Sequence, residues 1–404
     1  AETGFEVSPR LADMLLRVAK FTRLDENPGA ADYFYPNGKA LIAGQLRKNP
    51  EYASTLRALA EEGVGTFYGG ALAEQIVAAA QAQPNPGSLQ RSDLERYAVR
   101  VRPVVCGGFR ALEICSASPP SSGAMQIMVP RLYDYLQGQA SSGGKMQDFV
   151  DAQRLAYADR DHFFADPDWV DVPVEALLDK TYLQQRASAR FAPDAVPKHG
   201  DPLGSTALGA DTTQEPSGTT HLSLIDSEGN AVSFTATVES AFGSARWVGG
   251  FLLNNEMTDF ARSYDAEMPM PANVIAGGKR PRSSMSPTMV FDESGELVLV
   301  TGSPGGNSIP AYVAKTILGI FDWQLTPQQA ADHPNIIARG SKVRVEIGVD
   351  GGAEEAANLK ELGYEVQERE GENSGIHIIQ VTKDGLVGAA DMRREGTVRA
   401  WKAQ

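Results

Sequence analysis

Cysteine and histidine are scarce in this chain of 404 residues, which contains two cysteines and five histidines. Their positions do not match the ligand spacing of a zinc site, so a structural zinc domain is excluded and we expect neither a metal nor a cofactor. Cys106 and Cys115 flank the segment GGFRALEI, which is typical of a short hairpin. A turn at Gly107–Gly108 would not place the two cysteines opposite each other, so we expect free thiols rather than a disulfide.

The chain also lacks an excess of positive charge. It has 37 Lys and Arg residues against 51 Asp and Glu, a formal net charge of −14. A nucleic-acid partner needs a basic surface and an anionic membrane surface would repel this chain, so both partners are excluded. No apolar run approaches the ~18 residues of a membrane helix. The hydrophobic content of 42% indicates a globular protein with a real core.

Several common catalytic motifs are missing. There is neither a G-x-x-x-x-G-K-[ST] phosphate loop nor a G-x-S-x-G nucleophile elbow. Ser142 and Lys145 have β-lactamase spacing, but the partner motifs do not follow, so a glycine loop before a helix is the simpler interpretation. The run ADRDHFFADPDW lacks the glycine and glutamate of an EF-hand, and we interpret it as a solvated helix end leading into a turn. That run contains Asp159, Asp161, His162, Asp166 and Asp168.

The first half of the chain is predicted to be mostly helical. Ser8 fits the N-cap and Pro9 the first turn of a helix over 8–21. Further helices are predicted over 71–82, 92–98, 146–163 and 173–190, with a hairpin near 100–115. Ser92 and Glu95 have the spacing of a capping box. From 193 to 218 the pattern fades into a run rich in Pro, Gly, Asp and Thr, typical of a linker, a lid or a processed segment.

The second half begins with strand patterns. HLSLI and AVSFTATV flank DSEGN, TMVF and LVLV flank DESGE, and IHIIQV and LVGAA flank TKDG. Three such hairpins indicate antiparallel sheets. Helices are predicted over 308–322, 326–332 and 353–362, the last closed by Gly363. Helices, then sheets, then helices again predict a layered α+β fold.

A threonine stands where the linker becomes a strand, at Gly218–Thr219 in the run EPSGTTHLSLI. A threonine hydroxyl is a weak nucleophile until a base lies beside it. If the chain is cut before Thr219, the new α-amine has a pKa near about 8 and can accept the hydroxyl proton. Glycine before the threonine and a long linker suit such a cut. Gly-Thr-Thr at a strand start is also an ordinary sequence, so this junction alone does not establish catalysis.

Three further blocks resemble one enzyme family. The run from TTHLSLI to NNEMTDF, followed by KRPRSSMSPTMVF and VTGSPGG, closely resembles the small subunit of gamma-glutamyltranspeptidases. PPSSG, AYADRDHFFADPDWVDVP and GFEVSPRLA resemble parts of the large subunit, so the resemblance covers essentially the whole chain. It implies an N-terminal-nucleophile hydrolase with an αββα four-layer sandwich and self-cleavage at Gly218–Thr219. Residues 1–218, with a flexible linker over 193–218, would belong to the large subunit and 219–404 to the small subunit, together one structural domain.

The resemblance assigns roles residue by residue. Thr219 matches the nucleophile and new N-terminus, and Thr237 the threonine that orients it. Three acids match positions that hold the substrate α-ammonium, two serines the pair that binds its α-carboxylate, and two glycines the backbone donors of the oxyanion hole. These are Glu239, Glu256 and Asp259, then Ser283 and Ser284, then Gly305 and Gly306. For each acid the alternative interpretation is a solvated loop residue.

Two regions depart from the family pattern. The family's large subunit begins well upstream of the first residue here, so we expect its N-terminal part to be absent, including an arginine that clamps the glutamyl carboxylate. Arg10, Arg17 and Arg23 do not match the context of that arginine. The segment 260–282 lies where some family members carry a lid loop, and its intermediate length is compatible with a short lid.

We therefore expect a self-processing gamma-glutamyl hydrolase or transferase that acts through a glutamyl ester on Thr219. Its partners would be glutathione or a related gamma-glutamyl substrate, and water or an amine or peptide acceptor. The alternatives are a cephalosporin or glutaryl acylase of the same fold and a non-catalytic chain that stays uncut. By analogy with bacterial relatives we expect a periplasmic or secreted location.

Overall fold

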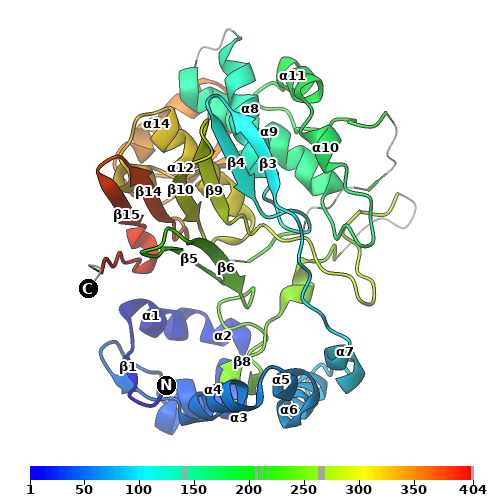
Figure 1. The fold of residues 1–404 in the computed structure, drawn as a ribbon, viewed down its shortest axis with the longest axis vertical. Helices are drawn as coiled ribbons and strands as arrows, with labels where there is room; N and C mark the ends of the chain where they lie inside the picture. The colour runs from blue at the N-terminus through cyan, green and yellow to red at the C-terminus, as the bar shows by residue number, and fades with distance from the viewer. Residues whose placement is uncertain are drawn as a thin grey trace. The chain divides into compact units, whose positions relative to one another are not determined.

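Contacts within the chain divide it into two units in the computed structural model, which describes residues 1–139, 143–204, 208, 209, 211, 213–216, 218–262 and 269–401. The first unit comprises 1–101 and 237–256, and the second comprises 102–236 and 257–404 (Figure 1). Each unit contains sequence from both sides of Gly218–Thr219. The two units are defined by packing, whereas the two expected subunits are defined by cleavage of that peptide bond. The cleavage stays a prediction.

The first unit is built from short helices. Its elements are β1 (Phe5–Glu6), α1 (Pro9–Arg17), α2 (Ala19–Thr22), η1 (Leu24–Glu26), α3 (Pro28–Phe34), η2 (Pro36–Gly38), β2 (Leu46–Arg47), α4 (Pro50–Glu62), α5 (Gly65–Gly69), α6 (Ala71–Gln81), α7 (Arg91–Glu95), β7 (Trp247–Val248) and β8 (Phe251–Leu252). The segment 237–256 packs into this unit through aromatic rings: Phe242 lies 5.6 Å from Phe34, and Trp247 stacks on Tyr33 at 4.9 Å. Residues far apart in sequence thus share one small core.

The second unit contains the larger sheet. Its elements are β3 (Val105–Phe109), β4 (Leu112–Ser116), α8 (Met125–Gln137), α9 (Gly144–Phe163), α10 (Val174–Leu177), α11 (Lys180–Ser188), β5 (Thr219–Ile225), β6 (Ala231–Thr237), β9 (Thr288–Asp292), β10 (Leu297–Gly302), η4 (Gly306–Ser308), α12 (Ile309–Phe321), α13 (Pro327–Asp332), β11 (Ile336–Arg339), β12 (Lys342–Glu346), α14 (Gly352–Glu361), β13 (Glu365–Arg369), β14 (His377–Thr382), β15 (Gly385–Ala390) and η5 (Met392–Arg394). The helix η3 (Glu256–Asp259) spans the boundary between the units.

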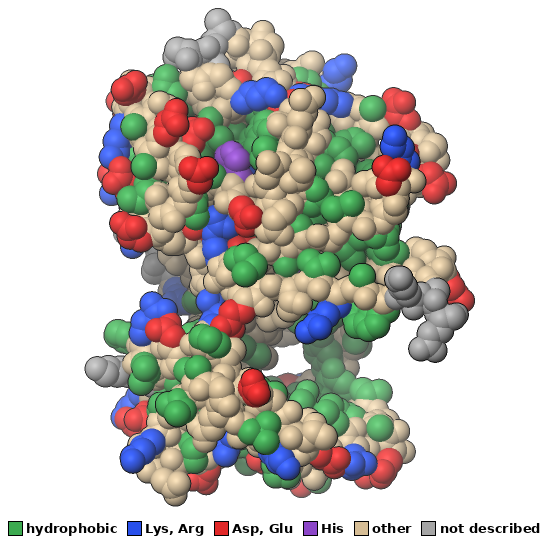
Figure 2. Space-filling view, turned by 90° about the vertical axis from the view of Figure 1, so that its left-hand side faces the viewer, with side chains coloured by type: hydrophobic (Ala, Val, Ile, Leu, Met, Phe, Trp, Pro, Cys, Tyr) green, Lys and Arg blue, Asp and Glu red, His purple; other side chains and the backbone are tan. Residues whose placement is uncertain are grey.

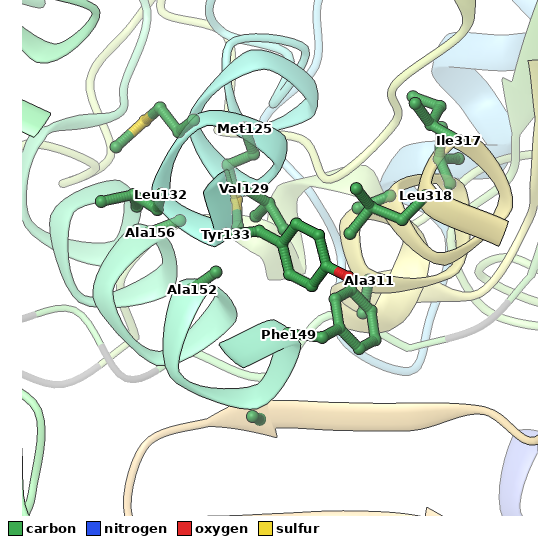
Figure 3. Close-up of a cluster of buried hydrophobic side chains, with 14 of the residues drawn as sticks. Met125, Val129, Leu132, Tyr133, Phe149, Ala152, Ala156, Ala311, Ile317 and Leu318 are labelled. Carbon is green, nitrogen blue, oxygen red and sulfur yellow. The ribbon is translucent and has the colours of Figure 1, made fainter. Parts of the chain in front are cut away.

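A six-stranded antiparallel sheet organises this unit, in the order β15-β14-β10-β9-β4-β3. The helices α8 and α12 pack against this sheet, and α9 packs against α8. The three helices meet in a shared apolar core, where Val129 and Tyr133 of α8 approach Phe149 of α9 and Leu318 of α12 (Figure 3). All four side chains are buried. Burial of this much apolar surface is the main stabilising contribution to such a layer.

The hairpin β5–β6 forms a separate two-stranded sheet that packs against β10 and β14 (Figure 1). Gly302 of β10 allows the close approach, because a Cβ there would lie 2.7 Å from Nε2 of His221 in β5. The open end of the hairpin carries the first residue of β5, Thr219, and the last residue of β6, Thr237. The helical layer, the large sheet and this hairpin give the α+β fold that the sequence predicts.

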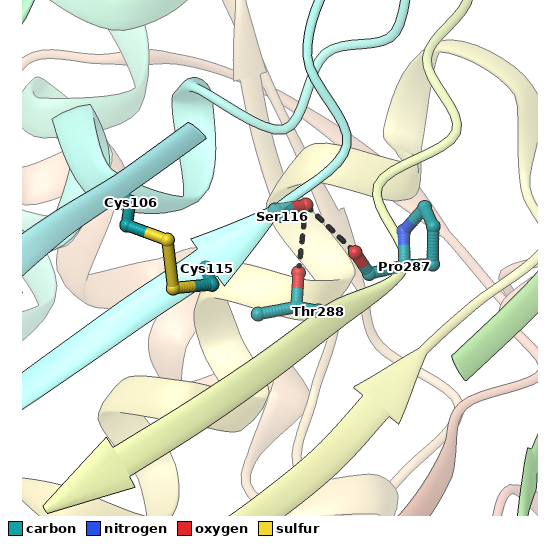
Figure 4. The surroundings of a disulfide bond; sticks show 5 residues. All are labelled: Cys106, Cys115, Ser116, Pro287 and Thr288. Atoms are coloured by element: carbon teal, nitrogen blue, oxygen red, sulfur yellow. Dashed lines mark hydrogen bonds between the residues drawn. A yellow bond between two sulfur atoms is a disulfide. The ribbon is translucent and has the colours of Figure 1, made fainter. Parts of the chain in front are cut away.

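The expectation of free thiols is wrong. Cys106 and Cys115 form a disulfide between β3 and β4 (Figure 4). The hairpin turns at Arg110–Ala111 rather than at the glycines, and its register places the two cysteines directly opposite each other. The prediction failed because it placed the turn at the wrong residues. The position of the turn sets the register, and the register decides which residues lie opposite each other.

Removal of this disulfide is expected to lower thermal stability. A crosslink that restricts the unfolded chain typically contributes about 2–4 kcal/mol, and the short loop here favours the lower end. The double substitution Cys106→Ser with Cys115→Ser should therefore melt several degrees below the parent in differential scanning calorimetry. Reductant should shift the parent to the same temperature and leave the double variant unchanged. Equal melting temperatures for both chains would contradict this prediction.

Most of the predicted elements are present, with local corrections. The three hairpins of the second half form β5–β6, β9–β10 and β14–β15. The helix expected over 173–190 is two helices, because Asp179 accepts a hydrogen bond from Tyr182 N and starts α11 as its N-cap. The short helix α7 is capped by Gln90 and Asp93, not by Ser92 and Glu95.

The acidic run over 159–168 is not a solvated helix end. Asp159 and Asp166 are fully buried and are paired with Arg186 and Arg102, respectively. Because α9 is buried along most of its length, its acids need cationic partners inside the protein. No group of His, Cys, Asp and Glu suited to a metal ion occurs among the described residues.

Charge is mixed on the face shown in Figure 2, where acidic and basic side chains are interspersed with apolar ones. Among the described residues, no helix has the length and apolar character needed to cross a bilayer. The Ser142–Lys145 pair cannot be assessed, because Ser142 lies outside the part of the chain that the structure describes.

Candidate active site

Thr219 is the first residue of β5 and is buried, with 6% of its surface exposed. The strand alternates between buried and exposed residues, so Thr219 and His221 share the inner face and Thr220 points outward. Arg394 Nη1 donates a hydrogen bond to the carbonyl oxygen of Thr219 at 2.8 Å. The predicted nucleophile thus stands at a fixed strand start rather than on a loose loop.

His221 anchors this strand and is a residue that the sequence analysis did not single out. Its Nδ1 lies 2.7 Å from Thr235 Oγ1, and its Nε2 lies 3.2 Å from Ser223 Oγ. Burial lowers the pKa of His221 to about 3, so the ring is neutral at pH 7. These contacts give it a structural role in joining β5 to β6 and β10.

Gly305 and Gly306 form the turn between β10 and α12. Both are buried, with φ of 144° and 57°, so a side chain at either position would be strained. Among the described residues, neither backbone amide donates a hydrogen bond. Buried amides without an acceptor are rare, and two adjacent ones are the arrangement expected of an oxyanion hole.

The segment before Thr219 lies directly on this turn. A Cβ at Gly306 would come within 3.0 Å of the carbonyl oxygens of Glu215 and Pro216. The amide of Asn307 donates to the carbonyl of Glu215 at 3.4 Å, and the amide of Glu215 donates to Asn307 Oδ1. The end of the linker therefore contacts Gly306 and Asn307 of this turn.

Ser284 contacts the same linker, and Ser283 precedes it in the chain. Ser122 Oγ donates to the carbonyl of Ser283 at 2.6 Å, which fixes the backbone of the pair. The hydroxyl of Ser284 accepts from Arg160 Nη2 at 2.6 Å and donates to the carboxylate of Glu215. In this uncut chain, the predicted carboxylate-binding serine thus already holds a carboxylate, that of the linker.

Two buried arginines complete this cluster and were missed in the sequence. Arg160 Nη2 donates to Glu215 Oε1 at 2.7 Å, and Arg282 Nε lies 3.6 Å from the same oxygen. Burial by itself raises the pKa of Glu215, but the two guanidinium charges outweigh that effect and hold its pKa below the ordinary value. The run ADRDH does contain Arg160, but nothing in it indicates which carboxylate the arginine meets.

The three predicted ammonium-binding acids are distributed over both units. Glu239 belongs to the first unit and is buried, with 3% exposure and φ of 73°, an uncommon conformation for a residue other than glycine. Its Oε2 accepts from Ser240 and Asn255, whereas its Oε1 is buried and accepts no hydrogen bond from a described residue. A buried carboxylate oxygen in that state is suited to a cation.

The other two acids lie on one short helix. η3 begins at Glu256, which is half-buried, and ends at Asp259, which is buried. The solvated-loop interpretation therefore does not hold for Glu239 or Asp259. Thr237, at the end of β6, accepts a hydrogen bond from the amide of Glu239 at 2.8 Å, which links the predicted orienting threonine to the first acid.

The predicted lid falls partly outside the described residues, because 263–268 are not described. In its described part, Asn273 donates to the carbonyl of Asp259 at 2.7 Å and to Asp211 Oδ2 at 3.0 Å. Its carbonyl oxygen Oδ1 accepts from the amide of Arg282 at 2.8 Å. This part of 260–282 thus connects one predicted acid to the linker.

Comparisons with known proteins identify the family of this chain. The sequence profile of the family described as gamma-glutamyltranspeptidase matches residues 1–401. The glutathione hydrolase proenzyme of Escherichia coli (strain K12) is 33% identical over 97% of this chain and 68% of its own length. The acylase ACY 1 proenzyme of Pseudomonas sp. (strain SE83) is 31% identical over 98% of this chain and 69% of its own length.

A solved structure supports the fold. The cephalosporin acylase from Bacillus halodurans superposes with a TM-score of 0.84 over 99% of this chain and 72% of that protein, at 24% identity. A likeness at 24% identity shows the fold alone. The family is shown by the profile, which matches residues 1–401. The chain is a member of the gamma-glutamyltranspeptidase family, whose members are hydrolases and transferases.

Proposed function

We propose that this chain is a self-processing gamma-glutamyl hydrolase or transferase with Thr219 as its nucleophile. One observation carries the proposal: buried Thr219 begins a strand, and the segment shortly before it contacts the turn that contains Gly305 and Gly306. A nucleophile, a peptide bond beside it and donors for an oxyanion are what acyl transfer needs.

Self-cleavage would proceed in two balanced steps. Thr219 Oγ attacks the carbonyl carbon of Gly218 and loses its proton, and the C–N bond then breaks as the nitrogen takes up a proton. This leaves an ester between Gly218 and Thr219 Oγ and a free α-amine on Thr219. Water hydrolyses the ester, which yields a carboxylate on Gly218 and restores the hydroxyl. Thr219 then carries its own base.

Substrate turnover would reuse the same groups. The α-amine of Thr219 takes the hydroxyl proton while Oγ attacks the γ-carbonyl, and the backbone amides of Gly305 and Gly306 donate hydrogen bonds that stabilise the oxyanion. The leaving amine receives the proton, and water or an acceptor amine resolves the glutamyl ester. Thr237 would orient the nucleophile. Glu239, Glu256 and Asp259 would hold the substrate ammonium, and Ser283 and Ser284 its α-carboxylate.

A second candidate is an acylase that removes a glutaryl-like group. The acylase names among the relatives favour it. Such substrates have no α-amine, however, and would leave the buried carboxylate of Glu239 without a cation. An unpaired buried charge is costly, so the acids favour the gamma-glutamyl substrate.

The two candidates differ in a direct rate comparison. We expect kcat/KM for gamma-glutamyl-p-nitroanilide to exceed that for glutaryl-p-nitroanilide by about 10–100-fold, since a charge-assisted hydrogen bond contributes about 1.5–3 kcal/mol. Glu239→Gln should reduce this preference, and Glu293→Gln, an exposed acid in a hairpin turn, should not. A higher rate on the glutaryl substrate would reject the gamma-glutamyl assignment.

Maturation and location follow from the same proposal. Denaturing electrophoresis should show two bands that correspond to 1–218 and 219–404, whereas one persistent band would support a non-catalytic chain.

The Cys106–Cys115 disulfide supports a periplasmic or secreted location, because disulfides persist in oxidising compartments. Glutathione and related gamma-glutamyl compounds are the substrates that we propose.

A further inference from the structure

The last part of the linker is held by buried charges. Asp211, Thr213 and Glu215 are alternate residues, and each is at least nine-tenths buried. Asp211 pairs with Arg282 at 3.1 Å, and the carbonyl of Thr213 accepts from Arg339 Nη2 at 3.0 Å. This alternation is the period of an extended strand with one face turned inward. The described end of the linker is thus attached to the second unit at several points.

Glu215 is the most strongly held of these residues. Its carboxylate binds Arg160, which is fully buried, and Ser284, and it lies near Arg282. Its backbone amide and carbonyl both bond to Asn307. Hydrogen bonds on the side chain and on both backbone groups fix the position and the direction of the chain at this residue.

The scissile bond lies a short distance along the chain from this anchor. Three residues separate Glu215 from Thr219, and the first of them, Pro216, has a fixed φ. On the other side of the bond, Thr219 is held by β5 and by the hydrogen bond from Arg394. The Gly218–Thr219 peptide therefore lies between two anchored residues, Glu215 on one side and Thr219 on the other.

We propose that Glu215 is a positioning residue for self-cleavage, whose carboxylate tethers the linker in the Arg160–Arg282–Ser284 pocket and so presents Gly218 to Thr219. This inference rests on the proposed self-cleavage and adds the residue that sets its geometry. A misplacement of about 1 Å can cost about 10²-fold in rate, which is the scale that a lost tether should produce.

The test measures first-order cleavage of freshly translated chain by pulse–chase electrophoresis. Glu215→Ala should slow cleavage about 10²-fold, and Glu215→Gln, which keeps the length and loses the charge, about tenfold. Asp211→Asn is the matched variant, because it removes a buried paired carboxylate from the same cluster farther from the scissile bond, and it should have the smaller effect. Mass spectrometry should place the cut before Thr219 in each chain.

Acetate distinguishes a tether from a counter-charge. Added to Glu215→Ala, acetate can occupy the arginine pocket and restore the melting temperature, measured in a Thr219→Ala background that stays uncut. It cannot hold the linker, so the cleavage rate should stay low. Restoration of the rate by acetate would overturn the proposal, because the carboxylate would then only balance Arg160 and Arg282.

Other outcomes are equally decisive. Cleavage of Glu215→Ala at the parent rate, or equal slowing by Asp211→Asn, would overturn the positioning role while the proposed function stands. If Glu215→Ala does not fold, Glu215→Gln decides: slowing at an unchanged melting temperature supports the tether. Each chain can also be assayed at a temperature that lies the same interval below its own melting temperature. If the variant then cleaves as fast as the parent, the slowing came from lower stability and the tether is contradicted. A parent chain that never cleaves would overturn the proposed function together with this inference.

Discussion

Thr219→Ala is expected to leave the chain as a single polypeptide and to abolish release of p-nitroaniline from gamma-glutamyl-p-nitroanilide. The substitution removes the oxygen that would form both the Gly218 ester and the glutamyl ester. Loss of a nucleophile that no other group replaces should lower the rate by about 10⁴-fold or more. Gel electrophoresis measures the first effect, and absorbance of the released product measures the second.

Thr220→Ala is the matched control for this experiment. It makes the same substitution at the next residue, whose side chain points outward from β5, so cleavage and turnover should both persist. Thr219→Ser keeps a hydroxyl and an α-amine and should retain part of both activities. If the Thr219→Ala chain turned over substrate at the parent rate, Thr219 would not be the nucleophile.

Gly306→Ala should have the next largest effect, a loss of self-cleavage by about 10²-fold or more. The residue has φ of 57°, where alanine is strained by about 1–2 kcal/mol, and its new methyl group would come within 3.0 Å of the carbonyl oxygens of Glu215 and Pro216. The linker must then move away from the glycine turn to avoid the new methyl group. Pulse–chase electrophoresis of the variant beside the parent measures the change.

The control for steric specificity is Gly277→Ala. Gly277 is exposed, and a Cβ there would have no atom within 4 Å, so this variant should mature like the parent. Calorimetry in a Thr219→Ala background separates local displacement of the linker from general unfolding of Gly306→Ala. Normal maturation of Gly306→Ala would show that the close contact between this turn and the linker has no part in cleavage.

Local sequence signals predicted well the elements that begin at a clear cap or are joined by a tight turn. Ser8 does cap α1, where it accepts a hydrogen bond from Leu11 at 3.1 Å, and the three turn-linked hairpins of the second half are present. Helices α8 and α4 were not predicted. α8 is buried on nearly every side and contains Pro130, so it shows no polar stripe from which a helical period could be read. The sheet β11-β12-β13 was missed as well.

The candidate site was recognised mostly through its family resemblance. Nothing about Gly305 and Gly306 in the sequence indicates that their amides find no acceptor among the described residues. Nothing about Glu239 indicates a buried oxygen that accepts no hydrogen bond from a described residue. Both properties depend on what lies around a residue in three dimensions. The cysteines illustrate the same limit, because one shifted turn changes the expected free thiols into a cross-strand disulfide.

By itself, the sequence determined the α+β class and the strand that begins at residue 219, because these depend on residue type and short-range pattern. The groups proposed for the chemistry were identified through the family resemblance. Only the tertiary structure decided that Asp211 and Glu215 of the linker are buried beside arginines and that Glu215 contacts the glycine turn. Ion pairs such as Arg160–Glu215 join residues far apart in the sequence, and no local period records their partnership. If the end of the linker were found detached from the pocket around Arg160, the proposed cleavage geometry would lose its basis.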